Sequence, residues 1–231
     1  INIKFVVIIS FLLVALYTFF SGIKGPAYTA VIKDILVWVI MLFLVVSIPI
    51  IHFGSWGSMI NKIVVESPEL LTIPTTGPKG IPWFLTASLV SGLALFMWAH
   101  AVTGVFTAKN ADVLRKNAIY LPFYNIVLIL VVFLGFAAYI VLPEGSDPRF
   151  ALLHLIQMSY GGVVQGLAYS TIALASLIPC SIMAIGASNL FANNIYRDFI
   201  DPNVKPAKLT MITRSMVFVV IGLASIFGML F

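Results

Sequence analysis

The sequence predicts an all-α protein, a bundle of about six transmembrane helices that together form one transmembrane domain over residues 1–231. Hydrophobic residues make up 61% of the chain and charged residues 9%, whereas soluble domains carry roughly 25% charged residues. A soluble chain of 231 residues cannot bury so much apolar surface. Six apolar stretches approach the ~20 residues that a helix needs to cross a bilayer. They cover residues 3–22, 29–53, 83–106, 120–142, 162–189 and 209–231.

The first stretch, residues 3–22, is longer than the roughly 7–15 apolar residues of a signal-peptide core. We therefore interpret it as a spanning helix. The chain begins with Ile1 and stops inside an apolar run at Phe231. From this we expect an internal piece of a longer polypeptide.

A pair of opposite charges lies near the start of the second stretch, residues 29–53. Gly25-Pro26 predicts a sharp turn before this helix, and Lys33-Asp34 follows close to the expected membrane boundary. One interpretation is an ion pair with a lysine that snorkels to the interface. The other is that Asp34 lines a charged inner vestibule.

The third stretch, residues 83–106, contains the candidate substrate site. Ser91-Gly92 lies about ten residues from its start, near the bilayer midplane at ~1.5 Å rise per residue. Transporters unwind helices at such glycines to bind substrate, although close helix packing explains a glycine equally well. The candidate substrate-binding residues are Ser91, Gly92, Phe96, Trp98, His100 and Thr103.

The connections on either side of the third and fourth stretches differ in character. Residues 54–82 contain four prolines and are expected to form a long loop. After the fourth stretch, residues 150–160 are compatible with a short helix lying on the surface.

The fifth stretch, residues 162–189, contains the candidate ion site. Its glycines and serines recur every four residues, a spacing that lets helices approach closely and needs no ligand. Pro179 is different, because it frees the carbonyl of Ala175. In lipid this carbonyl costs several kcal/mol unless protein, water or an ion satisfies it. The candidate ion-binding residues are Ala175, Ser176, Pro179 and Ser181, with a passive kink satisfied by a serine hydroxyl as the alternative.

Basic residues predict the orientation of the helices in the membrane. Nine of the thirteen flank the first, third and fifth connections between the predicted helices, whereas the second and fourth hold three, offset by four acidic residues. We therefore place the first group in the cytoplasm and the chain in the plasma membrane as a multi-pass protein. The net charge of +5 is scattered over loops and does not indicate nucleic-acid binding.

Several classes of function lack their sequence signals. The single cysteine excludes an internal disulfide and a cysteine metal cluster, and the three histidines show no metal-type spacing. Phosphate-loop, zinc, nucleophile-elbow and dinucleotide patterns are also missing. We therefore expect a protein that is not an enzyme and has no cofactor or metal, with no acidic residue inside the spans.

A series of motifs resembles the sodium:solute symporter family. Ala15–Gly22 followed by Gly25–Asp34 is similar to a family helix, a glycine-rich turn and a Thr-Asp pair, here Lys33-Asp34. Ser91–Gly104 is similar to a stretch that usually carries Pro-His, with Ala99 in place of the proline. Asn189–Arg197 is similar to an Asp-Ile-Tyr-Arg helix end, with Asn194 in place of the aspartate.

The resemblance implies a LeuT-type inverted-repeat fold and a secondary active transporter. It is closest to bacterial and archaeal monocarboxylate permeases, which implies a substrate such as lactate, pyruvate or acetate. Expected partners are this small molecule, membrane lipid and the rest of the same polypeptide, including a first broken helix. Three alternatives remain: a proton-coupled transporter of another organic solute or an amino acid, a membrane redox subunit, and a sensor domain that has lost transport.

The coupling ion is put in doubt by two positions. The resemblance places the family's sodium-binding carbonyl at Ala175 and its two hydroxyl ligands at Ile178 and Pro179, neither of which carries a hydroxyl. A hard cation such as sodium requires about six oxygens. We therefore expect sodium binding to be weakened and consider H⁺ as the alternative coupling ion.

Overall fold

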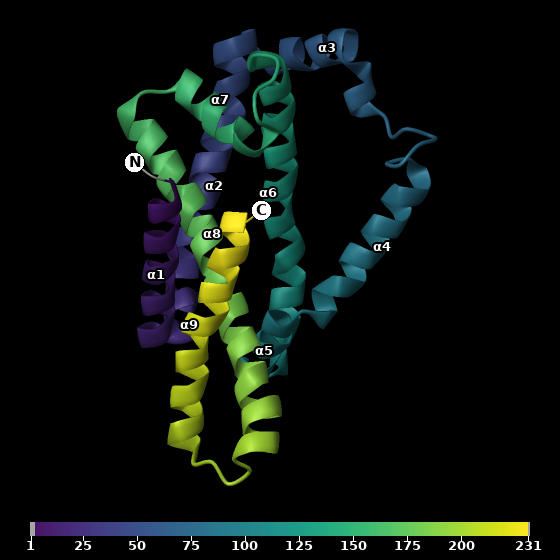
Figure 1. Ribbon diagram of the computed structural model, residues 1–231. Helices are drawn as coiled ribbons and strands as arrows, with labels where there is room; N and C mark the ends of the chain where they lie inside the picture. Colours follow the sequence, from purple (N-terminus) through teal and green to yellow (C-terminus); the bar gives the residue numbers. More distant parts are fainter. Residues whose placement is uncertain (1–2, 231) are drawn as a thin grey trace. The chain divides into compact units, whose positions relative to one another are not determined.

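The computed structural model describes residues 3–230, and the side chains of residues 5–94, 97, 98 and 100–230. Throughout this range the regular elements are helices (Figure 1). Four are long and apolar enough to cross a membrane: α2 (Lys24–Phe53), α6 (Ala111–Val141), α8 with its continuation (Gly162–Ile200), and α9 (Pro206–Leu230). Shorter apolar helices cover Phe5–Ser21 and Ile81–Ala94. These six segments fall on the six predicted stretches, and the fold is all-α and polytopic.

The chain divides into two compact units. One contains Ile1–Lys33, Phe96–Thr107 and Leu174–Phe231, and the other contains Asp34–Leu95 and Ala108–Ala173. The division passes through α2, α4 (Ile81–Met97) and α8, so each of these helices contributes to both units.

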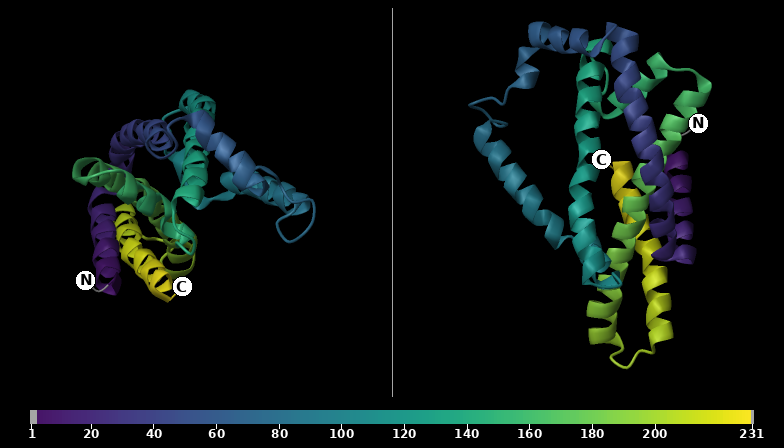
Figure 2. Two further views of the ribbon diagram at one scale, coloured as in Figure 1. Left: turned by 90° about the horizontal axis from the view of Figure 1, so that it is seen from above. Right: turned by 180° about the vertical axis from the view of Figure 1, so that it is seen from behind.

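In the first unit, α1 (Ile3–Ser21) packs along α9 (Figures 1 and 2). Ala15, Ala184, Val217 and Ile221 form a buried cluster that joins α1, α8 and α9. The rings of Phe19 and Phe218 extend this contact, with centroids 5.3 Å apart. Small residues on α1 and α8 face branched residues on α9, and this lets the helix backbones approach closely.

A tight turn joins α1 to α2. Gly22 has φ +56°, a left-handed conformation that glycine adopts without strain, and its amide donates to the Thr18 carbonyl at 2.9 Å. Three residues later, Gly25 lies so close to α1 that an added Cβ would fall 2.3 Å from the Cβ of Ser21. Tyr17 Oη and Thr29 Oγ1, 2.8 Å apart, link the two helices. The turn expected at Gly25-Pro26 thus occurs three residues earlier.

In the second unit, buried side chains of α2, α6 and α7 (Ala151–Ser159) form the core. The short helix α7 packs on α6 and matches the surface helix expected over residues 150–160. Its end is fixed by two side-chain hydrogen bonds to α2: His52 Nε2 to Ser159 Oγ at 2.8 Å, and Tyr160 to Ser47. Before α7, hydrogen bonds from Arg149 hold the pKa of Asp147 below its ordinary value.

The proline-rich segment 54–82 is more ordered than the sequence suggested. Its first part forms α3 (Trp56–Glu66), which begins at Ser55, whose hydroxyl accepts from the Ser58 amide at 3.1 Å. Met59 and Ile63, four residues apart, are buried. The expected loop is therefore half helix, because a serine cap precedes an amphipathic pattern with i, i+4 spacing. The 3₁₀ turn Pro68–Leu71 follows it.

Candidate functional site

The third predicted helix is broken in two. Helix α4 (Ile81–Met97) ends and α5 (Ala99–Thr107) begins around Trp98. The Trp98 carbonyl accepts hydrogen bonds from the amides of Ala101 and Val102 at 3.0 and 3.1 Å, which starts the new helix. Each helix end leaves backbone groups without partners in the helix. The break therefore presents the last carbonyls of α4 and the first amides of α5 at one point in the chain.

The position of the break corrects the sequence interpretation. Interruption of the helix at Gly92 was one of two interpretations, but Gly92 lies inside α4 with helix on both sides. A glycine inside a helix costs only about 1 kcal/mol relative to alanine, which is too little to break one. Gly92 is exposed, and an added Cβ would meet open space in the described part of the chain. The interruption comes six residues later, at Trp98.

Two of the six candidate substrate residues are in direct contact. The rings of Trp98 and His100 have centroids 5.0 Å apart and are inclined by 48°. Trp98 is half-exposed, and His100 and Thr103 are half-buried on α5 in the same compact unit.

The other candidates are not joined to this pair. Ser91 and Gly92 belong to the other unit, and the side chain of Phe96 lies outside the described residues. The hypothesis that all six line one substrate site therefore stays a prediction.

The candidate ion site lies within a continuous helix. Helix α8 (Gly162–Leu190) passes through Pro179 without ending. Ser181 is fully buried and its hydroxyl donates to the Leu177 carbonyl at 3.0 Å. A hydroxyl has one hydrogen to donate, so Ser181 does not satisfy the Ala175 carbonyl that Pro179 frees. Ile178, at one of the two positions where the family carries a hydroxyl, is also buried.

The charged candidate Asp34 lies further from the start of its helix than expected. Helix α2 begins at Lys24, five residues before the predicted start, so Asp34 lies ten residues inside it. The side chain is half-buried, with one carboxylate oxygen fully covered. With 30 residues, α2 is about 45 Å long and exceeds the ~30 Å hydrocarbon core, so the expectation that acidic residues stay outside the spans stays a prediction. Ionisable residues within spanning helices are typical of functional sites.

Sequence reasoning missed the local structure at the end of α8. Residues Phe191–Ile200 form a π-helix, a conformation often found at functional sites. The side-chain amide of Asn193 donates to the Asn189 carbonyl at 3.0 Å, which compensates for a backbone group displaced from the α-helical pattern. One turn earlier, the buried Ser188 Oγ has no hydrogen-bond partner among the described residues. Two consecutive amides, Asn193-Asn194, were the available signal.

Long apolar helices define a multi-pass membrane protein, in which one apolar helix is broken at Trp98 and another contains Pro179. Comparison with known families identifies it further. The family model of the sodium:solute symporters matches residues 1–231, and the chain belongs to this family.

Its relatives include two symporters described as uncharacterized, both from Bacillus subtilis. YodF is 77% identical over the whole chain, and YhjB is 35% identical over 93% of it. A monocarboxylate transport permease protein of Rhizobium johnstonii is 33% identical over 90% of the chain. The chain spans 47%, 44% and 43% of these three proteins, about half of each. No solved structure matches the chain.

Proposed function

We propose that the protein is a secondary active transporter that carries a small monocarboxylate together with a cation. The family and the monocarboxylate permease relative support this proposal. The observation that carries it is the helix break at Trp98. Spanning helices keep their backbone bonded internally unless the irregular segment lines a polar cavity or is buried in protein, and broken helices are typical of transporter binding sites.

The chemistry of the break fits a small carboxylate. The amides at the start of α5 carry the positive end of the helix dipole, which favours an anion. Trp98 adds an indole N–H, and His100 adds an imidazole. The rings of these two residues are in contact. A carboxylate of two or three carbons leaves an apolar remainder that the Trp98 ring can cover. The role of the protein in this scheme is binding and translocation, with no chemical step.

The coupling ion follows from α8. Ile178 and Pro179 offer no hydroxyl oxygen at the two positions where the family carries one. This favours H⁺ over Na⁺, although the family name points to sodium. A proton-coupled transporter requires a titratable group within the membrane. We propose Asp34, half-buried on α2, as this group.

The test is equilibrium binding of radiolabelled lactate, pyruvate and acetate to the purified full-length protein. Trp98→Ala and His100→Ala are expected to weaken binding, each by at least tenfold, since a hydrogen bond to a charged group contributes about 1.5–3 kcal/mol. Phe106→Ala is the control, because this exposed residue lies two turns along the same helix. Unchanged binding in both variants would refute the site, and binding of none of the three acids would refute the substrate class.

A further inference from the structure

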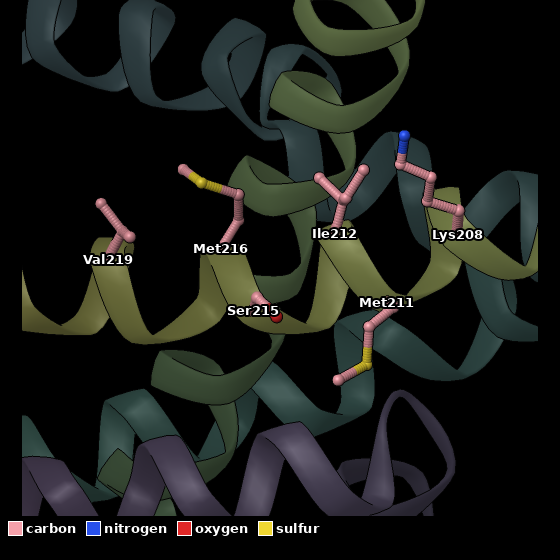
Figure 3. Close-up of a pocket in the computed structure, with 6 residues that line it drawn as sticks. All are labelled: Lys208, Met211, Ile212, Ser215, Met216 and Val219. Carbon is pink, nitrogen blue, oxygen red and sulfur yellow. The ribbon is translucent and has the colours of Figure 1, made fainter. Parts of the chain in front are cut away.

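A groove runs along α9, apart from the proposed transport site. Its volume is about 240 Å³, and its lining comes from this helix alone: Lys208, Met211, Ile212, Ser215, Met216 and Val219. Figure 3 shows Lys208, Ile212, Met216 and Val219 in a row, with Lys208 at one end and Val219 at the other. The face of α9 that packs on α1 carries Val217 and Ile221 instead.

The groove is amphipathic along its length. One end carries an ammonium group, and the rest of the lining is apolar apart from the Ser215 hydroxyl. From Lys208 to Val219 the helix rises about 16 Å at ~1.5 Å per residue. That length matches one leaflet, half of the ~30 Å hydrocarbon core of a bilayer. Two of the lining residues are methionines, whose flexible side chains adapt to an irregular apolar partner.

Lys208 is held in place at the mouth of the groove. Its Nζ lies 3.0 Å from Asp201 Oδ2 and 5.8 Å from the centre of the Tyr196 ring. An ammonium has three donors, so the carboxylate bond leaves capacity for an additional acceptor. The segment 196–214 contains four cationic side chains and two carboxylates. The surroundings of the groove mouth are therefore positive.

From this geometry we propose that the groove binds one anionic phospholipid of the cytoplasmic leaflet. The phosphate accepts a hydrogen bond from Lys208, and an acyl chain lies along Ile212, Met216 and Val219. The placement follows from the distribution of basic residues, which puts the turn between the π-helix and α9 in the cytoplasm. The cytoplasmic leaflet carries anionic lipids that attract such residues. Charge at the mouth and one-leaflet length distinguish this occupant from a neutral lipid or a polar solute.

The first test is lipid binding to the delipidated full-length protein in detergent, measured by native mass spectrometry with phosphatidylglycerol and phosphatidylcholine. Lys208→Met is expected to weaken phosphatidylglycerol binding about fivefold, the attraction expected from one basic residue at an anionic lipid surface. Ser215→Leu fills the groove and is expected to weaken it similarly. Lys205→Met is the matched control, because it removes a charge in the same turn without lining the groove.

Three outcomes would overturn the proposal. Equal losses in the Lys208 and Lys205 variants would indicate diffuse attraction. A loss in the Lys208 variant with unchanged binding in the Ser215 variant would place the acyl chain outside the groove. Equal binding of the two lipids by the unmodified protein would exclude charge selection.

A second measurement does not depend on these variants. With Cys180 replaced by alanine, a fluorophore on Met211→Cys is expected to be quenched by brominated phosphatidylglycerol. The same fluorophore on Val217→Cys should resist quenching, because Val217 is buried against α1. No quenching at position 211 would show that another part of the full-length chain covers the groove, and would refute the proposal.

Discussion

The turn between α1 and α2 gives a sharp prediction for stability. In Gly25→Ala the new Cβ would lie 2.3 Å from Ser21 Cβ, 2.1 Å from Ser21 Oγ and 3.1 Å from Tyr17 Oη. Carbon atoms in contact are about 3.5–4.0 Å apart, so the overlap with Ser21 Cβ exceeds 1 Å. A Cβ is fixed to the backbone and moves only with it. We expect a cost of about 1–3 kcal/mol, the range for overpacked sites.

A double-mutant cycle isolates the contact. Ser21→Gly removes both Ser21 atoms that clash, and should restore most of the stability lost in Gly25→Ala. The Ser21→Gly variant alone loses the hydrogen bond to the Tyr17 carbonyl, which is 2.7 Å long, so the cycle is needed to separate the two effects.

The assay is the temperature at which the purified full-length protein loses its monodisperse peak in size-exclusion chromatography. Gly25→Ala should lower this temperature by several degrees. Gly222→Ala is the control, because its Cβ meets open space among the described residues of α9, and helix propensity predicts a gain of up to about 1 kcal/mol. If Gly25→Ala is as stable as the parent, or if Ser21→Gly gives no rescue, the close approach at this turn is refuted.

Three further predictions concern topology, ion binding and α7. With Cys180 replaced, a cysteine at Lys79 should react with an impermeant thiol reagent in intact cells and one at Lys109 should not; the reverse pattern would invert the proposed orientation. Pro179→Ser returns one hydroxyl to α8 and should strengthen sodium binding by about 10- to 150-fold, on the basis of about 1.5–3 kcal/mol per dipole contact with a charge; an unchanged affinity in a sodium-binding assay would contradict the ligand assignment. Ser159→Ala removes the hydroxyl that lies 2.8 Å from His52 Nε2 and should lower the unfolding free energy by about 0.5–1.5 kcal/mol. Ser146→Ala, in an exposed loop, is its control, and equal stability of the two variants would show that the bond to α2 is unimportant.

Composition and the length of the apolar stretches predicted a membrane protein and the positions of its helices. They did so because a bilayer requires apolar helices of about 20 residues. The sequence offered Gly92, and not Trp98, as a possible interruption of the third helix, because glycine at mid-depth is typical of unwound transporter helices. At Trp98 no residue with low helix propensity marks the end of α4. Where α4 ends depends on which of its backbone amides and carbonyls find hydrogen-bond partners outside the helix. A single sequence does not show those partners.

Two other elements, α3 and the π-helix after α8, had local sequence signals that the sequence analysis did not use. Ser55, Met59 and Ile63 show a cap and an amphipathic spacing inside a segment that its prolines identified as a loop. The segment Phe191–Ile200 forms a π-helix. Its one sequence signal is Asn193, whose side-chain amide donates to the Asn189 carbonyl. The candidate ion residues Ala175, Ser176, Pro179 and Ser181 lie on α8, and ion binding by them stays a prediction.

The most direct test of the account is uptake of radiolabelled pyruvate by vesicles that contain the full-length protein. A pH gradient, acidic outside, and a sodium gradient are imposed in separate experiments, each with an ionophore control that abolishes the gradient. The account predicts accumulation above the external concentration under the pH gradient, its loss with the ionophore, and little accumulation under the sodium gradient. Accumulation driven only by sodium would contradict the interpretation of Ile178 and Pro179, and no accumulation under either gradient would contradict the proposed monocarboxylate transport itself.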